Sequence, residues 1–128
     1  MGKKKVEPIQ MKLSDLLNFV RERIDTGKYA AQEGVDQDFG NAEVAAEDMQ
    51  SLSGLKEFYD DDCVIEFRPA PEHLPLGRAA NAIEGLYLRI QQDAENCKRK
   101  RKAKKLEALS EQVEGCLHEI RNIQSRWE

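Results

Sequence analysis

Seven of the eight residues from Lys98 to Lys105 are basic, and this run is the part of the sequence best suited to bind a ligand. Cations at this density repel one another along a helix, so an anion that neutralises them stabilises the segment. Nucleic-acid phosphates do this well, because each neutralised phosphate releases condensed counterions. The predicted polyanion-binding residues are Lys98, Arg99, Lys100, Arg101, Lys102, Lys104 and Lys105.

The sequence leaves three interpretations of this basic run open. The first is contact with a polyanion, and the second is a nuclear-import signal, which has a similar composition. In the third, the run is a solvated stretch balanced by the protein's own acidic residues. These are concentrated in residues 31–75, where twelve Asp and Glu stand against Lys56 and Arg68. The formal net charge is −4, so the run's +7 leaves −11 on the other 120 residues.

A stripe of apolar residues follows the basic run at spacings that alternate between three and four residues. This pattern is typical of a helix that packs against another helix. It predicts self-association or an obligate partner chain, although packing against the protein's own N-terminal helix is an alternative. The predicted helix-pairing residues, with Leu117 widening the stripe, are Leu106, Leu109, Val113, Cys116, Leu117, Ile120, Ile123 and Trp127.

A basic run followed by apolar heptads is similar to a basic leucine zipper over residues 98–127. That family reads base edges with Asn and Ala residues placed ahead of its basic cluster. Here Asn96 directly adjoins Cys97 and the cations, and the preceding sequence IQQDAE is acidic. We therefore do not assign the chain to that family, and expect any nucleic-acid contact to be with the backbone, without sequence readout.

Catalytic and metal-binding chemistry have no comparable pattern. His73 and His118 lie far apart in the sequence and near no Cys or Ser in the arrangement of a nucleophilic site. Three acidic residues match ligand positions of a calcium-binding loop. Such a loop also needs a ligand residue followed directly by a turn glycine, but here the order is reversed, because Gly40 precedes Asn41. The sequence thus predicts no catalytic residue, no metal site and no cofactor, and a protein that is not an enzyme.

Cysteine spacing and hydropathy predict the cellular compartment. Cys63, Cys97 and Cys116 are odd in number and widely spaced, which favours a reducing, intracellular compartment: the cytoplasm, or the nucleus in a eukaryote. No stretch approaches the roughly 18 apolar residues of a membrane span, so we expect no membrane partner.

Composition predicts a mainly α fold. Of the 128 residues, 40% are hydrophobic but only 6% are aromatic, while 34% are charged. Such a chain buries a thin aliphatic core, as helical proteins that bind partners do more often than compact enzymes.

Residues 1–68 are predicted to form a small acidic helical module. After a basic lead-in at residues 1–12, apolar residues at helical spacing predict a helix over residues 14–26. Ser14 is its expected N-cap, and Gly27 occupies the position of a left-handed C-cap.

The rest of this module is predicted to hold a loop, a second helix and one strand. Residues 28–40 are acidic and glycine-bearing and predict a loop, with a single helical turn within it left open. A helix is expected to begin near Asn41. The sequence VIEF at residues 64–67 is the strand candidate. One face of the second helix is predicted to carry Val44, Ala45, Met49 and Leu52.

Residues 69–77 contain three prolines and predict a stiff connector, followed by a long C-terminal helix or helical hairpin over residues 78–128. The stretch from 79 to 127 has no proline, and a continuous helix of 49 residues would span roughly 73 Å. The apolar stripe changes register inside the basic run, which predicts either a bend or a locally unpaired helix. Because no turn-forming residue lies between 97 and 106, the continuous helix is favoured.

Together these features predict a non-enzymatic helical assembly or adaptor protein. Its C-terminal stripe would pair with another chain, and Lys98–Lys105 would contact nucleic-acid phosphates or another acidic surface. The alternative is a protein-binding inhibitor or regulator. In that case the acidic segment 31–75 would engage a basic site on a nucleic-acid-handling target by charge mimicry.

Overall fold

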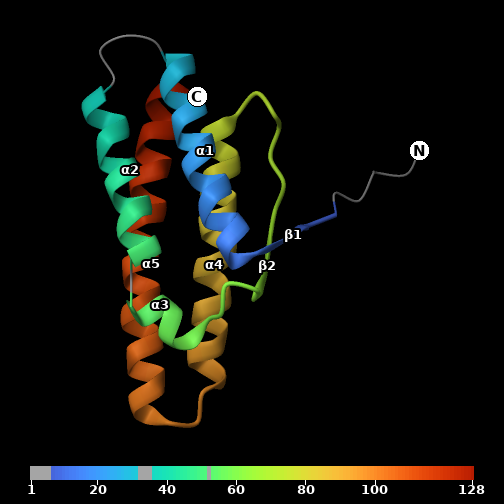
Figure 1. The fold of residues 1–128 in the computed structure, drawn as a ribbon, viewed down its shortest axis with the longest axis vertical. Helices are drawn as coiled ribbons and strands as arrows, with labels where there is room; N and C mark the ends of the chain where they lie inside the picture. Colours follow the sequence, from blue (N-terminus) through green and yellow to red (C-terminus); the bar gives the residue numbers. More distant parts are fainter. Residues whose placement is uncertain (1–6, 32–35, 52) are drawn as a thin grey trace.

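The computed structural model describes residues 7–31, 36–51 and 53–128. These residues form a mainly helical structure, which confirms the predicted fold class (Figure 1). The elements, in chain order, are β1 (Ile9–Lys12), α1 (Leu13–Ala31), α2 (Asp36–Ser51), α3 (Ser53–Phe58), β2 (Val64–Phe67), α4 (Pro75–Asn96) and α5 (Lys100–Trp127).

The longest two helices, α4 and α5, form an antiparallel hairpin, and the others cover it. Helix α1 packs against α4, and α2 packs against both α5 and α1. The hairpin extends below the ends of α1 and α2, where short α3 lies beside it (Figure 1). The turn of the hairpin therefore forms one tip of the molecule.

The preference for one continuous C-terminal helix is wrong, because the chain reverses at residues 97–99. Cys97 and Arg99 have extended backbone conformations, with φ and ψ of −81° and 120° at Cys97 and −89° and 114° at Arg99. Reversal lays the apolar stripe of α4 against the out-of-register stripe of α5. Burial of both stripes outweighs the local preference for helix, as tertiary packing commonly does.

Helix α1 is longer than predicted at its C-terminal end, because Gly27 does not cap it. Gly27 is buried inside the helix, and a Cβ there would lie 2.9 Å from Cγ of Leu76 on α4. Its role is close helix packing rather than termination. At the other end the Ser14 hydroxyl donates to the carbonyl of Asp61 at 3.3 Å, so Ser14 ties α1 to a loop instead of acting as an N-cap.

Residues 28–31 and 36–40, predicted as loop, are helical. The second helix therefore begins at Asp36 rather than near Asn41, and its buried face differs from the predicted one. Val44 is 56% exposed, and the residues that reach the core are Phe39, Ala42 and Ala46. Ala45 is partly buried beside them, and the side chains of Met49 and Leu52 lie outside the described ones.

The predicted strand at 64–67 is confirmed as β2, but its partner was not expected. Strand β1 lies in the segment interpreted as a lead-in, and pairs with β2 in antiparallel register, Ile9 opposite Phe67 and Lys12 opposite Val64. On the inner face of β2, Ile65 and Phe67 are buried. The ribbon thus covers a side of α4 that the other helices leave open.

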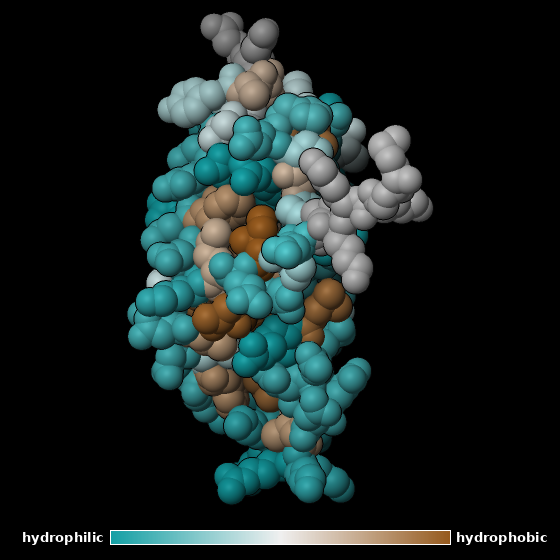
Figure 2. All heavy atoms as spheres, turned by 90° about the vertical axis from the view of Figure 1, so that its right-hand side faces the viewer, coloured by the Kyte–Doolittle hydropathy of each residue, from teal (hydrophilic) through white to brown (hydrophobic). Residues whose placement is uncertain are grey.

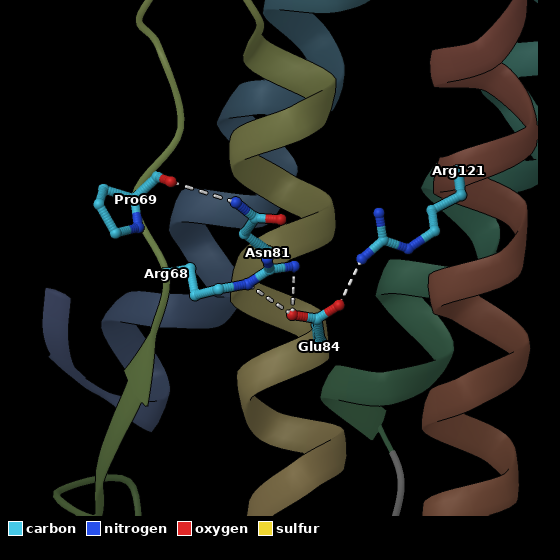
Figure 3. A network of polar contacts seen from close by, with 5 residues as sticks. All are labelled: Arg68, Pro69, Asn81, Glu84 and Arg121. Carbon is cyan, nitrogen blue, oxygen red and sulfur yellow. Dashed lines mark hydrogen bonds and ion pairs between the residues drawn. The ribbon is translucent and has the colours of Figure 1, made fainter. Parts of the chain in front are cut away.

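Glu84, in the middle of α4, joins β2, α4 and α5 (Figure 3). Its Oε1 accepts from Arg68 at 2.7 and 3.0 Å, and its Oε2 accepts from Arg121 of α5 at 2.6 Å. Asn81, one turn earlier, donates to the carbonyl of Pro69 at 3.3 Å. Charge-assisted hydrogen bonds of this kind fix the ribbon and the hairpin relative to each other.

The predicted connector at residues 69–77 overlaps α4, which begins at Pro75, so residues 68–74 link β2 to α4. Buried side chains from both sides of this link belong to one hydrophobic cluster. Pro75 opens α4 at the position where a missing N–H costs nothing. The next two N–H groups, of Leu76 and Gly77, donate to the carboxylate of Glu128 at 2.5 and 2.9 Å. The C-terminal end of α5 therefore caps the N-terminal end of α4.

Candidate functional site

The basic run lies at the tip of the hairpin, across the turn at 97–99 and the first turn and a half of α5. Figure 2 shows hydrophilic residues at the lower end of the molecule, where Figure 1 places this turn. All seven cations are exposed. Because the run is divided between an extended turn and a helix, its charges spread over the end of the molecule rather than around one helix.

The cations of the run have few partners in the described part of the chain. Lys105 forms an ion pair with Glu57 of α3, at 3.4 Å. Lys102 lies over the ring of Phe58, with Nζ 5.8 Å from the ring centroid. Within residues 7–31, 36–51 and 53–128, the other five have no hydrogen bond or ion pair from their side chains. Among its described side chains, the acidic segment thus pairs with only one cation of the run.

The N-terminus of α5 adds positive potential at the same place. The capping residue, Arg99, makes no side-chain cap hydrogen bond, and the first turn contains no acidic residue. The helix dipole places partial positive charge at this end, where carboxylates are normally stabilising and cations are not. Lys100, Arg101 and Lys102 stand there instead. A bound anion would accept from the free N–H groups and neutralise these side chains.

A hollow of about 270 Å³ lies beside the run, between the end of α3 and the hairpin tip. Its wall contains both aromatic and polar groups, from Phe58, Tyr59, Asp93, Asn96, Cys97, Lys102 and Leu106. The Tyr59 hydroxyl donates to Asp93 Oδ2 at 2.6 Å, and Arg89 Nε donates to the same oxygen at 3.1 Å. Burial, and then the bond to Asp93, raise the pKa of the Tyr59 hydroxyl, so it remains a protonated donor.

The predicted helix-pairing residues, with one exception, are buried within the chain. Seven lie in the seam that α5 forms with the other helices: Leu106, Leu109, Val113, Cys116, Leu117, Ile120 and Ile123. Trp127 is 40% exposed, and its ring lies 6.4 Å from that of Phe39 on α2. The stripe packs within the chain, but against α4 and α2 rather than against the N-terminal helix α1 that the sequence offered as the alternative.

A second pair of cations lies away from the tip, near the N-terminal end of α4, whereas the turn at 97–99 follows its C-terminal end. Arg23 of α1 and Arg78 of α4 lie over the ring of Phe19, at 5.0 and 5.5 Å from its centroid. Their Nε atoms are buried, and among the described residues neither atom has a hydrogen-bond partner. No short sequence pattern predicts this cluster, because its members are scattered through residues 19–78.

The three cysteines differ in exposure. Cys63 and Cys97 are partly buried, and Cys97 lies at the start of the turn, where its thiol donates to the carbonyl of Arg99 at 3.5 Å. Cys116 is 3% exposed, and burial raises the pKa of its thiol to about 12. The thiolate, which is the reactive form, is therefore almost absent from Cys116 at neutral pH.

We expect iodoacetamide at pH 8 to alkylate Cys63 and Cys97 and to leave Cys116 unmodified. The raised pKa keeps the Cys116 thiol protonated below about pH 12, whereas unfolding exposes it and returns its pKa to near 9. Peptide mass spectrometry with and without denaturant measures this difference. Modification of Cys116 in the native protein at the rate of Cys97 would contradict the packing of α5.

The histidines and the other possible metal ligands do not gather at one place in the part of the chain described. His73 and His118 are both exposed, on the connector and on α5. No group of three or more His, Cys, Asp or Glu side chains comes together there to hold a metal ion. Nor does any described helix combine the length and the apolar composition needed to cross a membrane.

Comparison with protein-family models, curated protein sequences and solved structures finds no match to this chain. Its function must therefore be argued from the surface just described.

Proposed function

We propose that this protein is a non-enzymatic helical adaptor that contacts nucleic-acid phosphates, or a polyanion of similar charge density, through Lys98–Lys105. One observation carries the proposal. Among the described residues, only Lys105 of the seven cations pairs with a carboxylate. Long, exposed Lys and Arg side chains suit backbone contact, and such contacts carry no sequence information. On this proposal the protein acts inside the cell, where nucleic acid is present and its three free cysteines stay reduced.

The helical hairpin presents the cations rather than pairing with a second chain through its apolar stripe. Val113 and Ile120, at the centre of the stripe, are fully buried. A partner protein that belongs to the adaptor role would therefore bind another surface of the molecule, or would have to open the hairpin at a high cost in buried apolar area.

Salt-dependent binding tests the proposal. We expect the protein to bind a labelled duplex at about 50 mM salt and to lose affinity steeply toward 200 mM, because backbone binding releases counterions. The test variant carries five Lys or Arg to Gln changes, at Lys98, Arg99, Lys100, Arg101 and Lys102. Fluorescence anisotropy should show weaker binding and a slope of log K against log salt that is shallower by up to about 4.5, or 0.9 per lost contact.

A matched control separates the position of the cations from net charge. It removes five positive charges outside the run and outside α3, by changing to Gln the residues Lys5, Lys12, Arg21, Lys28 and Arg126. We expect this control to retain most of the wild-type affinity and slope, and circular dichroism should show unchanged helix content in both variants. Equal losses in the two variants would mean that only the net charge matters.

The acidic regulator is the second candidate, and the exposure of the loop before β2 favours it. Asp60, Asp61 and Asp62 are exposed, and Lys12 pairs with Asp62 at 3.5 Å. These carboxylates are available to a basic site on another protein. A wild-type protein that ignores nucleic acid at about 50 mM salt, where backbone binding is strongest, would reject the first proposal in favour of this one.

A further inference from the structure

We propose that the hollow beside the basic run receives one unpaired base of a single-stranded nucleic acid, stacked on the ring of Phe58. The inference rests on the proposed function, since phosphates on Lys98–Lys105 would bring the strand to the hollow. Backbone contact alone does not distinguish single strands from duplex, whereas a pocket for an unpaired base would select single strands.

The hollow directly adjoins the basic run. Cys97, in its wall, directly precedes Lys98, and Lys102 both lines the hollow and belongs to the run. A phosphate held by the run and a base in the hollow would therefore come from the same or neighbouring nucleotides. In a duplex the bases are stacked and paired inside, out of reach of such a side pocket.

The wall of the hollow combines an aromatic ring with a cation. Phe58 is half-buried, and its ring packs at the margin of the core, so its position is fixed while part of it stays accessible. The Lys102 ammonium already lies over this ring, at 5.8 Å from the centroid. An aromatic face beside cations is the combination by which proteins hold single strands: the ring stacks a base and the cations track the backbone.

The size and the polar groups of the hollow fit one base. About 270 Å³ is below the range typical of drug-sized ligands and suits a single flat ring system. The Asn96 amide, on the rim, has both a donor and acceptors for base edges. Asp93 is held by Tyr59 and Arg89 through Oδ2, and in the described residues its Oδ1 has no partner, which leaves an acceptor for a base amino group.

The experiment compares two strands of equal charge. One is a single-stranded DNA dodecamer, and the other is the same backbone with every base replaced by an abasic sugar. We expect the wild-type protein to bind the dodecamer with bases at least about fivefold more tightly, the lower end of the range for one stacked base. Phe58→Leu keeps an apolar side chain but removes the flat ring, and should abolish this preference while leaving the affinity for the abasic strand unchanged.

Phe19→Leu is the matched control, because Phe19 is also a partly buried ring with cations over it, but lies elsewhere on the molecule. It should leave the preference intact. Equal wild-type binding of the two strands would overturn the base pocket while the phosphate contacts of the proposed function survive. Binding of neither strand would reject the proposed function itself. The wild-type comparison decides the question even if Phe58→Leu fails to fold.

Discussion

Ile120→Asp should unfold the protein or reduce its stability by about 3–5 kcal/mol, the largest effect that we expect from a single substitution. Ile120 is fully buried on α5, in the seam that faces the other helices. A carboxylate there loses its hydration and gains no partner. Since small domains are stable by only about 5–15 kcal/mol, this is a large fraction of the total. Urea denaturation followed by circular dichroism measures it.

Gln112→Asp is the control, because it places the same carboxylate on an exposed position of the same helix. Its effect should stay within about 0.5 kcal/mol, as is usual for surface substitutions. Comparable losses in the two variants would show that the buried face of α5 has been assigned to the wrong residues. The same pair tests solubility, since an opened hairpin would expose the stripe and aggregate.

The sequence predicts two long apolar stripes correctly, Ala79, Ile83, Leu86, Ile90, Ala94 and Cys97 before the basic run and Leu106 to Trp127 after it, because helical spacing is a direct consequence of 3.6 residues per turn. It did not predict that they face each other. The signal was present, since the stripe changes register between Cys97 and Leu106. The absence of glycine and proline there favours a continuous helix, but the burial of two stripes contributes more free energy than one turn residue does.

Strand β1 shows a different reason for failure. The residues Ile9–Lys12 alternate between half-buried and exposed, a pattern of only four residues, too short to predict a strand by itself. They become a strand because VIEF at 64–67 lies opposite, in a register that no local pattern encodes. Likewise, the residues next to Gly27 in the sequence predict a C-cap, whereas glycine fits this position because Leu76, 49 positions away, packs closely against it.

The sequence predicts which charged residues make up the candidate site, but not how they are arranged in space. Seven cations in eight residues are visible in the printed sequence. These cations are divided between a turn and the start of a helix because the chain reverses at 97–99. The hollow beside them forms because Phe58 of α3 lies against the hairpin tip. Neither feature has a local signature, so sequence alone could not choose between a solvated run and a built binding surface.

Gly85→Ala should destabilise the protein by about 1–3 kcal/mol, although the same change in an ordinary helix interior stabilises by about 0.5–1 kcal/mol. A Cβ at Gly85 would lie 2.5 Å from Cβ of Phe67 and even closer to the carbonyl oxygen of Glu66. The second obstacle is backbone, so β2 itself must move away from α4. That movement would loosen the Arg68–Glu84 pair, which joins the end of β2 to the hairpin.

Gly115→Ala, on the neighbouring helix α5, should change the stability in the opposite direction. Gly115 is exposed in α5, and nothing lies within 4 Å of a Cβ built there, so alanine should raise stability by about 0.5–1 kcal/mol. Urea midpoints at an unchanged m-value measure both effects. If Gly85→Ala also stabilised, β2 would not lie against α4 as described. The ribbon would then be a loosely held appendage of the hairpin, because only a close approach of the two backbones makes glycine necessary at this position.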